Sequence, residues 1–116
     1  MTDRIRRLEA ETALDVKTSS NTGWKDLGAD SIGGAIGSFV LKSLTGGSSP
    51  DVTPRLETSP TNDENNVHTA DTGSALSAVG NRYLIRTGDP LFRYCRFAWD
   101  TTGSPTAATA DWELNA

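Results

Sequence analysis

The nine residues Leu91–Trp99 constrain the fold more than any other part of the chain, because they combine large aromatic side chains and arginines without a glycine or proline. Such a run is typical of a β-strand, and the side chains of a strand alternate between its two faces. One face would carry Leu91, Arg93, Cys95, Phe97 and Trp99, and the other Phe92, Tyr94, Arg96 and Ala98. Each face holds bulky apolar groups, so we predict a strand that is covered on both sides.

The arginines of this strand allow two interpretations. In the first, they pair with carboxylates of the same domain, such as Asp100 or Asp111, while their aliphatic stems pack on the core. In the second, one face of the strand packs on the core and the other contacts a neighbouring subunit. We favour the second, because Tyr, Trp, Phe and Arg are enriched in protein interfaces.

The strand belongs to a predicted C-terminal β unit, residues 75–116. Earlier in the chain, residues 18–44 are predicted to form a linker that contains the first strands. The strands that we expect lie at 22–27, 38–44, 81–87, 91–99 and 106–114. Within 31–44 the apolar residues recur every four positions, as in a helix, but each of its three glycines would cost a helix about 1 kcal/mol. Helix and strand both remain open there, and we predict a glycine-rich loop to residue 37 followed by a strand.

The N-terminal segment, residues 1–17, is predicted to form a short helix over 3–15. Ile5, Leu8 and Thr12 fall at helical spacing. This spacing ends after about one heptad, and a helix of about 12 residues is marginal by itself. We therefore expect the apolar side of the helix to rest on a partner surface.

Residues 45–74 are nearly all polar and are interrupted by Pro50, Pro54, Pro60 and a glycine pair. Proline and glycine in such number favour turns and loops. A structureless tract of this length is uncommon within a compact domain and is usually functional or disordered. We predict an extended polar arm that lies on a neighbouring subunit.

Composition indicates a domain that depends on its neighbours. Leu, Ile, Val and Phe make up about 19% of the 116 residues, whereas Thr, Ser, Gly, Asn and Pro make up about 41%. So few large apolar side chains build only a thin core. We expect a mainly β fold: a small antiparallel β-sandwich or barrel-like domain, with a short N-terminal helix and a long extended arm.

The sequence also argues against an enzyme. Cys95 and His68 are the only cysteine and histidine, so neither an internal disulfide nor a Cys/His zinc cluster can form. Gly28–Gly34 has the glycine spacing of a phosphate-binding loop, but Gly34 occupies the position of the required lysine. We expect no catalytic, cofactor-binding or metal-binding residues. No run approaches the roughly 20 apolar residues of a membrane span, so we expect no membrane partner.

Four arginines, Arg82, Arg86, Arg93 and Arg96, make residues 82–96 locally basic in a chain of net charge −4. Basic and aromatic residues together can bind single-stranded nucleic acid. The chain as a whole is acidic, with a pI near 4.8, and lacks the basic footprint of such proteins. We expect no nucleic-acid partner and predict that the arginines attract the acidic arm of a like subunit.

A family resemblance follows from the layout of the whole chain. Ile5-Arg-Arg-Leu-Glu9 leads into segments rich in Thr, Gly and Ser, and tryptophan-containing strands end in Trp99-Asp-Thr-Thr-Gly103 and Asp111-Trp-Glu-Leu-Asn115. In composition and layout the sequence resembles the small virion proteins of tailed bacteriophages, either capsid decoration (cement) proteins or short head or tail fibres. The resemblance implies a non-enzymatic, β-rich and commonly trimeric subunit. Because the heptad pattern is short and no repeated glycine-punctuated shaft follows, we favour a decoration protein.

The resulting hypothesis is a virion protein, assembled in the host cytoplasm, whose partners are like subunits (a trimer is favoured) and the major capsid protein or other virion subunits. The residues that we predict to form interfaces are Ile5, Leu8, Trp24, Arg82, Arg86, Arg93, Tyr94, Arg96, Phe97, Trp99 and Trp112. The alternative is a short fibre or a receptor- or glycan-binding module, in which an exposed Trp24 or Trp112 stacks on a sugar.

Overall fold

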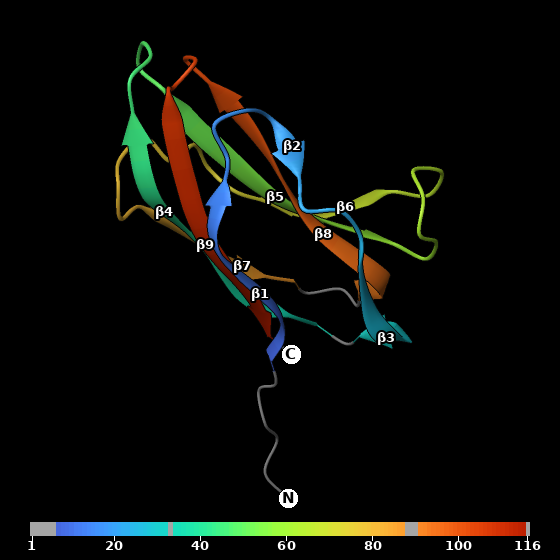
Figure 1. Cartoon of the computed structure of the whole chain (residues 1–116). Coiled ribbons are helices and arrows are strands. Elements are labelled where there is room, and N and C mark those ends of the chain that lie inside the picture. Colours follow the sequence, from blue (N-terminus) through green and yellow to red (C-terminus); the bar gives the residue numbers. More distant parts are fainter. Residues whose placement is uncertain (1–6, 33, 88–90, 116) are drawn as a thin grey trace, which may run out of the picture.

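The computed structural model describes residues 7–32, 34–87 and 91–115, and every regular element within these ranges is a β-strand (Figure 1). The strands are β1 (Arg7–Asp15), β2 (Ser20–Asn21), β3 (Lys25–Ile32), β4 (Ile36–Thr45), β5 (Asp51–Ser59), β6 (His68–Thr72), β7 (Arg82–Arg86), β8 (Leu91–Thr102) and β9 (Ala107–Asn115). They form two antiparallel sheets. Sheet A has the order β1-β9-β4-β7, and sheet B has the order β2-β8-β5-β6, with β3 also paired to β8. The predicted mainly β class is confirmed.

The core lies between the two sheets. Phe39 on β4 and Phe97 on β8 face each other with ring centroids 6.1 Å apart, and Phe97 also packs on Trp112 of β9 at 4.4 Å. All three side chains are at most 3% exposed. At one edge of the sandwich, Lys25 of β3 bonds Glu11 of β1 at 2.9 Å and so links the two sheets. A few aromatic rings therefore provide much of the burial that the scarce aliphatic residues cannot.

The run Leu91–Trp99 forms a strand, as predicted, and this strand lies in the interior of sheet B. Strand β8 pairs with β5 along one side and with β2 and β3 along the other. Its inward face buries the side chains of Leu91, Cys95, Phe97 and Trp99. The predicted strands at 38–44, 81–87 and 106–114 are confirmed as β4, β7 and β9, while the one at 22–27 overlaps β3 only in part.

Strand β4 begins before the residue expected from the sequence, because it includes Gly37. A Cβ atom at Gly37 would collide with the backbone carbonyl oxygen of Glu113 on β9. This glycine is thus the residue that lets two strands approach closely, and it is not part of a loop. The helical alternative for 31–44 is wrong over the described part of that segment.

The predicted N-terminal helix is wrong over its described part. Residues Arg7–Asp15 form strand β1, which pairs antiparallel with β9. A single helix of this length is marginal, and β9 offers a backbone partner along most of the segment instead. Ala13 adopts a left-handed conformation (φ 54°) at an irregularity in the pairing, where its N–H donates to Asp111 Oδ1 at 2.8 Å. Residues 3–6, which include Ile5, lie outside the described residues.

The predicted extended arm is also wrong, because its first half is the inner strand β5 of sheet B. Val52 and Leu56 are fully buried, and β5 pairs with β8 and β6. Pro54 is tolerated within this strand. Val52 exchanges both backbone hydrogen bonds with Leu76, so the missing N–H of Pro54 faces the same side, beyond the end of β6, and not β8. The Gly73 N–H still donates to the Pro54 carbonyl at 2.7 Å.

Candidate interaction surfaces

Arg96 is the centre of a charged cluster on the outward face of sheet B. Its Nε donates to Glu57 Oε1 at 2.8 Å, and its Nη1 and Nη2 donate to the two carboxylate oxygens of Glu64 at 2.7 Å each. Its guanidinium carbon also lies 4.1 Å from the centre of the Trp24 ring. Arg96 is only 8% exposed. Its guanidinium group is held by Glu57, by Glu64 and by the ring of Trp24. We call Arg96, Glu57, Glu64 and Trp24 the Arg96 cluster.

The Arg96 cluster fixes the loop that joins β5 to β6, residues 60–67. Trp24 Nε1 donates to Glu64 Oε2 at 3.0 Å, so the loop carboxylate is bonded from two sides. The hydrogen bond from Arg96 lowers the pKa of Glu64 below its usual value. The predicted attraction between the arginines and the acidic 45–74 segment therefore occurs within one chain for Arg96.

The other arginines of sheet B are paired as well. Arg55 bonds Glu57 at 3.0 Å and Asp100 at 2.8 Å. Arg93 donates to both carboxylate oxygens of Asp26, at 3.0 and 3.1 Å, and this bond lowers the pKa of Asp26. These contacts match the interpretation in which arginines pair with carboxylates of their own domain.

The outward face of sheet A presents a different surface, which we call the sheet A face. Leu84 on the edge strand β7 is 68% exposed, and Ile36 on the adjacent β4 is 37% exposed. Arg82 and Arg86, on either side of Leu84, are also exposed, and no described carboxylate pairs with either of them. The register places these residues in three rows across β7, β4 and β9: Arg82–Val40–Asp111, Leu84–Ser38–Glu113 and Arg86–Ile36–Asn115.

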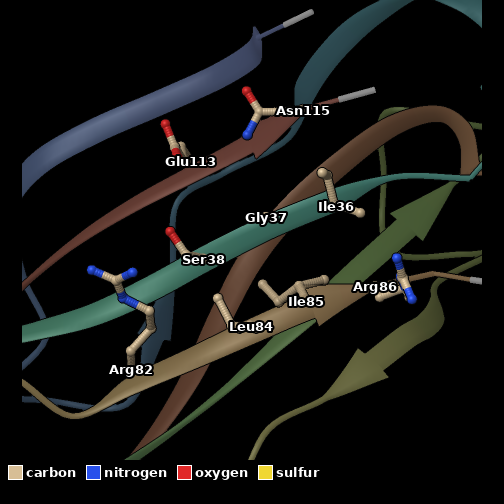
Figure 2. A pocket seen from close by; sticks show the side chains of 9 residues that line it. All are labelled: Ile36, Gly37, Ser38, Arg82, Leu84, Ile85, Arg86, Glu113 and Asn115. Carbon is tan, nitrogen blue, oxygen red and sulfur yellow. The ribbon is translucent and has the colours of Figure 1, made fainter. Parts of the chain in front are cut away.

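A shallow hollow of about 490 Å³ lies in the sheet A face (Figure 2). Gly37 and Ser38 form its floor on β4, Leu84 stands on its β7 side, and Glu113 on its β9 side. Ser38, which is in register with Leu84 and Glu113, contributes only a short side chain between these two longer ones. The face therefore runs from basic side chains on β7, across apolar side chains and a depression, to acidic side chains on β9.

The predicted interface residues fall into distinct places. Phe97, Trp99 and Trp112 lie in the core and are at most 3% exposed. The prediction of an exposed Trp112 is wrong, because this residue of β9 points toward sheet B and packs on Phe97. Tyr94 is half-buried, and Leu8 lies in β1. Whether these residues meet a partner stays a prediction.

Sequence reasoning missed the apolar residues of the sheet A face. In Arg82–Arg86 the alternation places Arg82, Leu84 and Arg86 on one face and Tyr83 and Ile85 on the other. That pattern was available as a signal, because an exposed leucine between two arginines is neither a core face nor an ordinary solvated face. Glu57 and Glu64 were missed because they lie in the segment that was expected to be an arm.

Within the described residues, no three His, Cys, Asp or Glu side chains are grouped so as to hold a metal ion. No helix found there has the length and apolar character needed to cross a membrane.

No family model matches the chain, and no curated protein matches it. Among solved structures, it is similar to a chain from the structure of the infectious bursal disease virus Gx strain (13% identity, TM-score 0.43). It is also similar to a chain from the crystal structure of the infectious bursal disease virus VP2 subviral particle (16% identity, TM-score 0.41). Both matches cover 97% of this chain but only 32% of the other chain. The resemblance to bacteriophage proteins stays a prediction.

Proposed function

We propose that this chain is a non-enzymatic structural protein of a virus particle, of the capsid-decoration (cement) class, which binds neighbouring capsid subunits and stabilises them. The bacteriophage-like layout of the sequence suggests this class. The sheet A face is the observation that carries the proposal. It combines exposed apolar side chains with arginines, and arginine is among the residue types in which protein interfaces are enriched.

The structure modifies the means by which such a protein would bind. An arm is replaced by two strands and a docked loop, and three of the predicted aromatic contacts are buried in the core. The contact surface that we propose is therefore a preformed sheet face. A preformed surface loses little conformational entropy on binding, which suits a protein that has to clamp subunits already in place.

The experiment is to purify virus particles on a density gradient from cells that carry the gene for this chain. We expect the chain to migrate with the particles, and particles assembled without it to release their contents at a lower temperature. A chain that stays in the soluble fraction while intact particles form would refute the proposal. Leu84→Asp should remove the chain from particles, whereas Val79→Asp, at another exposed apolar residue (60% exposed), should not.

The glycan-binding alternative has less support. Of the three tryptophans, only Trp24 is partly exposed, and its ring is covered by the Arg96 guanidinium on one side. A sugar-stacking platform needs an open aromatic face. Loss of glycan-array binding in a Trp24→Ala variant would revive this alternative.

A further inference from the structure

We infer that the sheet A face binds the same face of a second copy of this chain, with the two copies related by a two-fold axis parallel to the strands. The inference rests on the proposed function and narrows it: of the two kinds of partner expected from the sequence, like subunits and capsid subunits, it assigns the sheet A face to a like subunit, so that the chain would reach a capsid as a dimer. It depends on the register of β7, β4 and β9 and on the charges that this register brings together.

Two sheet faces related by a two-fold axis can meet in two simple ways. If the axis runs across the strands, β7 of one copy faces β7 of the other, and the Arg82 and Arg86 side chains of both copies come together. Like charges facing one another are strongly unfavourable in an interface. If the axis runs along the strands between β4 and β7, each β7 faces β4 of the other copy. Charge therefore selects the second arrangement.

The second arrangement also matches shape. An axis along the strands leaves each residue at its own height, and Leu84 is in register with Ser38. Leu84 of one copy then lies over Ser38 of the other, at the hollow that Ser38 helps to line. Because a two-fold contact is self-complementary, the same insertion occurs twice, and it covers both of these 68%-exposed leucines.

The arginines complete the contact. In this arrangement Arg82 of one copy lies over Val40 of the other, since these residues are also in register. The acidic strand β9 follows only ~4.8 Å farther on, within the length of an arginine side chain. There Asp111 stands in the row of Val40, and Glu113 in the row of Ser38. Each copy thus offers its basic edge to the acidic strand of the other.

The size of the face predicts how tight the contact is. With the axis between β4 and β7, only these two strands of each copy overlap. Two strands about 4.8 Å apart and up to nine residues long, at ~3.4 Å per residue, give a footprint of roughly 300 Å² per copy. A standard stable interface buries ~800 Å² per partner. We therefore expect a dimer that dissociates on dilution and weakens as salt is added.

The experiment is sedimentation velocity of the whole chain over a wide range of protein concentration, at low and at high salt. We expect a shift from monomer to dimer with rising concentration. Leu84→Asp should abolish the shift, whereas the matched control Val79→Asp should leave it unchanged. A wild-type chain that stays monomeric throughout, or a shift that the two variants weaken equally, would refute the inference.

A charge exchange tests the geometry itself. Arg82→Glu alone and Asp111→Lys alone each place like charges opposite one another at both symmetric contacts, so each variant should be monomeric. An equimolar mixture of the two variants should form a heterodimer. At one of its contacts the introduced carboxylate faces the introduced ammonium group, and at the other the unaltered Arg82 faces the unaltered Asp111. A mixture that stays monomeric while each variant is folded would refute this pairing.

The second variant needs a control, because Asp111 also accepts a hydrogen bond from the Ala13 N–H. Circular dichroism should therefore first establish that the Asp111→Lys variant is folded. If it is not, Arg82→Glu and Leu84→Asp, both at exposed sites, still decide whether the face associates.

The outcomes separate this inference from the proposed function. A dimer that never migrates with virus particles supports the inference and refutes the virion role. A monomer that binds particles through Leu84 supports the virion role and shows that a capsid subunit, not a second copy, occupies the face. A trimer that Leu84→Asp leaves intact would refute the two-fold contact.

Discussion

Replacing Arg96 by methionine should lower the free energy of unfolding of the domain by about as much as a large-to-small substitution in its core. Met retains the apolar stem but removes every charged donor of the Arg96 cluster. Glu57, only 7% exposed, then keeps Arg55 as its one remaining ion-pair partner within the part of the chain that the structure describes. Removing one member of a buried ion pair typically costs about 3–5 kcal/mol. The lost contact with Trp24 adds about 1 kcal/mol. Because Arg55 still compensates Glu57 in part, we expect a total loss of about 3 kcal/mol.

Urea unfolding followed by tryptophan fluorescence and far-ultraviolet circular dichroism measures this loss as a lower midpoint with an unchanged slope. The matched variant is Glu64→Gln, which alters the solvent-exposed end of the same cluster, where ion pairs contribute little. A second variant, Arg96→Met with Glu57→Leu, replaces both partners with apolar groups and should recover much of the stability. If Arg96→Met unfolds at the same urea concentration as Glu64→Gln, Arg96 is not the buried support of this face.

Three further predictions concern single side chains. Trp99→Phe should cost about 1 kcal/mol more than Trp112→Phe in urea unfolding, because the Trp99 indole donates to a backbone carbonyl at 2.8 Å whereas the buried Trp112 indole has no partner among the described residues. The pKa of Tyr83 is raised from 10.0 to about 12, mainly by burial of the phenol group and next by its hydrogen bond to the Asp71 carboxylate of β6. The wild type should therefore lose stability between pH 10 and pH 12 relative to a Tyr83→Phe variant, and equal losses in both would contradict this. The pKa of Glu64 is lowered in the fold, so its contribution to stability is present above its unfolded value of about 4.5 and disappears as the pH falls. Amide exchange in the loop at 60–67 should accelerate in acid in the wild type, but should already be fast at neutral pH in Glu64→Gln.

The strands that the sequence predicted correctly are those whose own residues determine them. The aromatic and β-branched runs of β7 and β8 alternate between two faces and lie between turns, so local pattern is sufficient. The two failures arise where pairing partners determine the structure. In β1 the marginal helix gives way to pairing with β9, which is the last strand of the chain. In β5 a proline is accepted because its missing N–H faces the end of β6. The residues of β1 and β5 alone do not show which strands will pair with them, so their own sequence could not predict either outcome.

Pairing partners also explain why the proposed interface lies on β7, whereas the sequence pointed to β8. Arg96 and Arg82 are the same residue type in neighbouring strands of the sequence, and their charge contributes equally to the basic character of residues 82–96. Arg96 donates two hydrogen bonds to Glu64 of the loop and one to Glu57 of β5, so few of its donors remain for a partner. Arg82 lies on an edge strand beside an exposed leucine, with the acidic strand β9 two positions across the sheet. An arginine contributes to association when its charge is not already compensated within its own chain. We therefore propose that the interface lies on Arg82–Arg86, and that Leu91–Trp99, which first suggested an interface, contributes mainly to the stability of the domain.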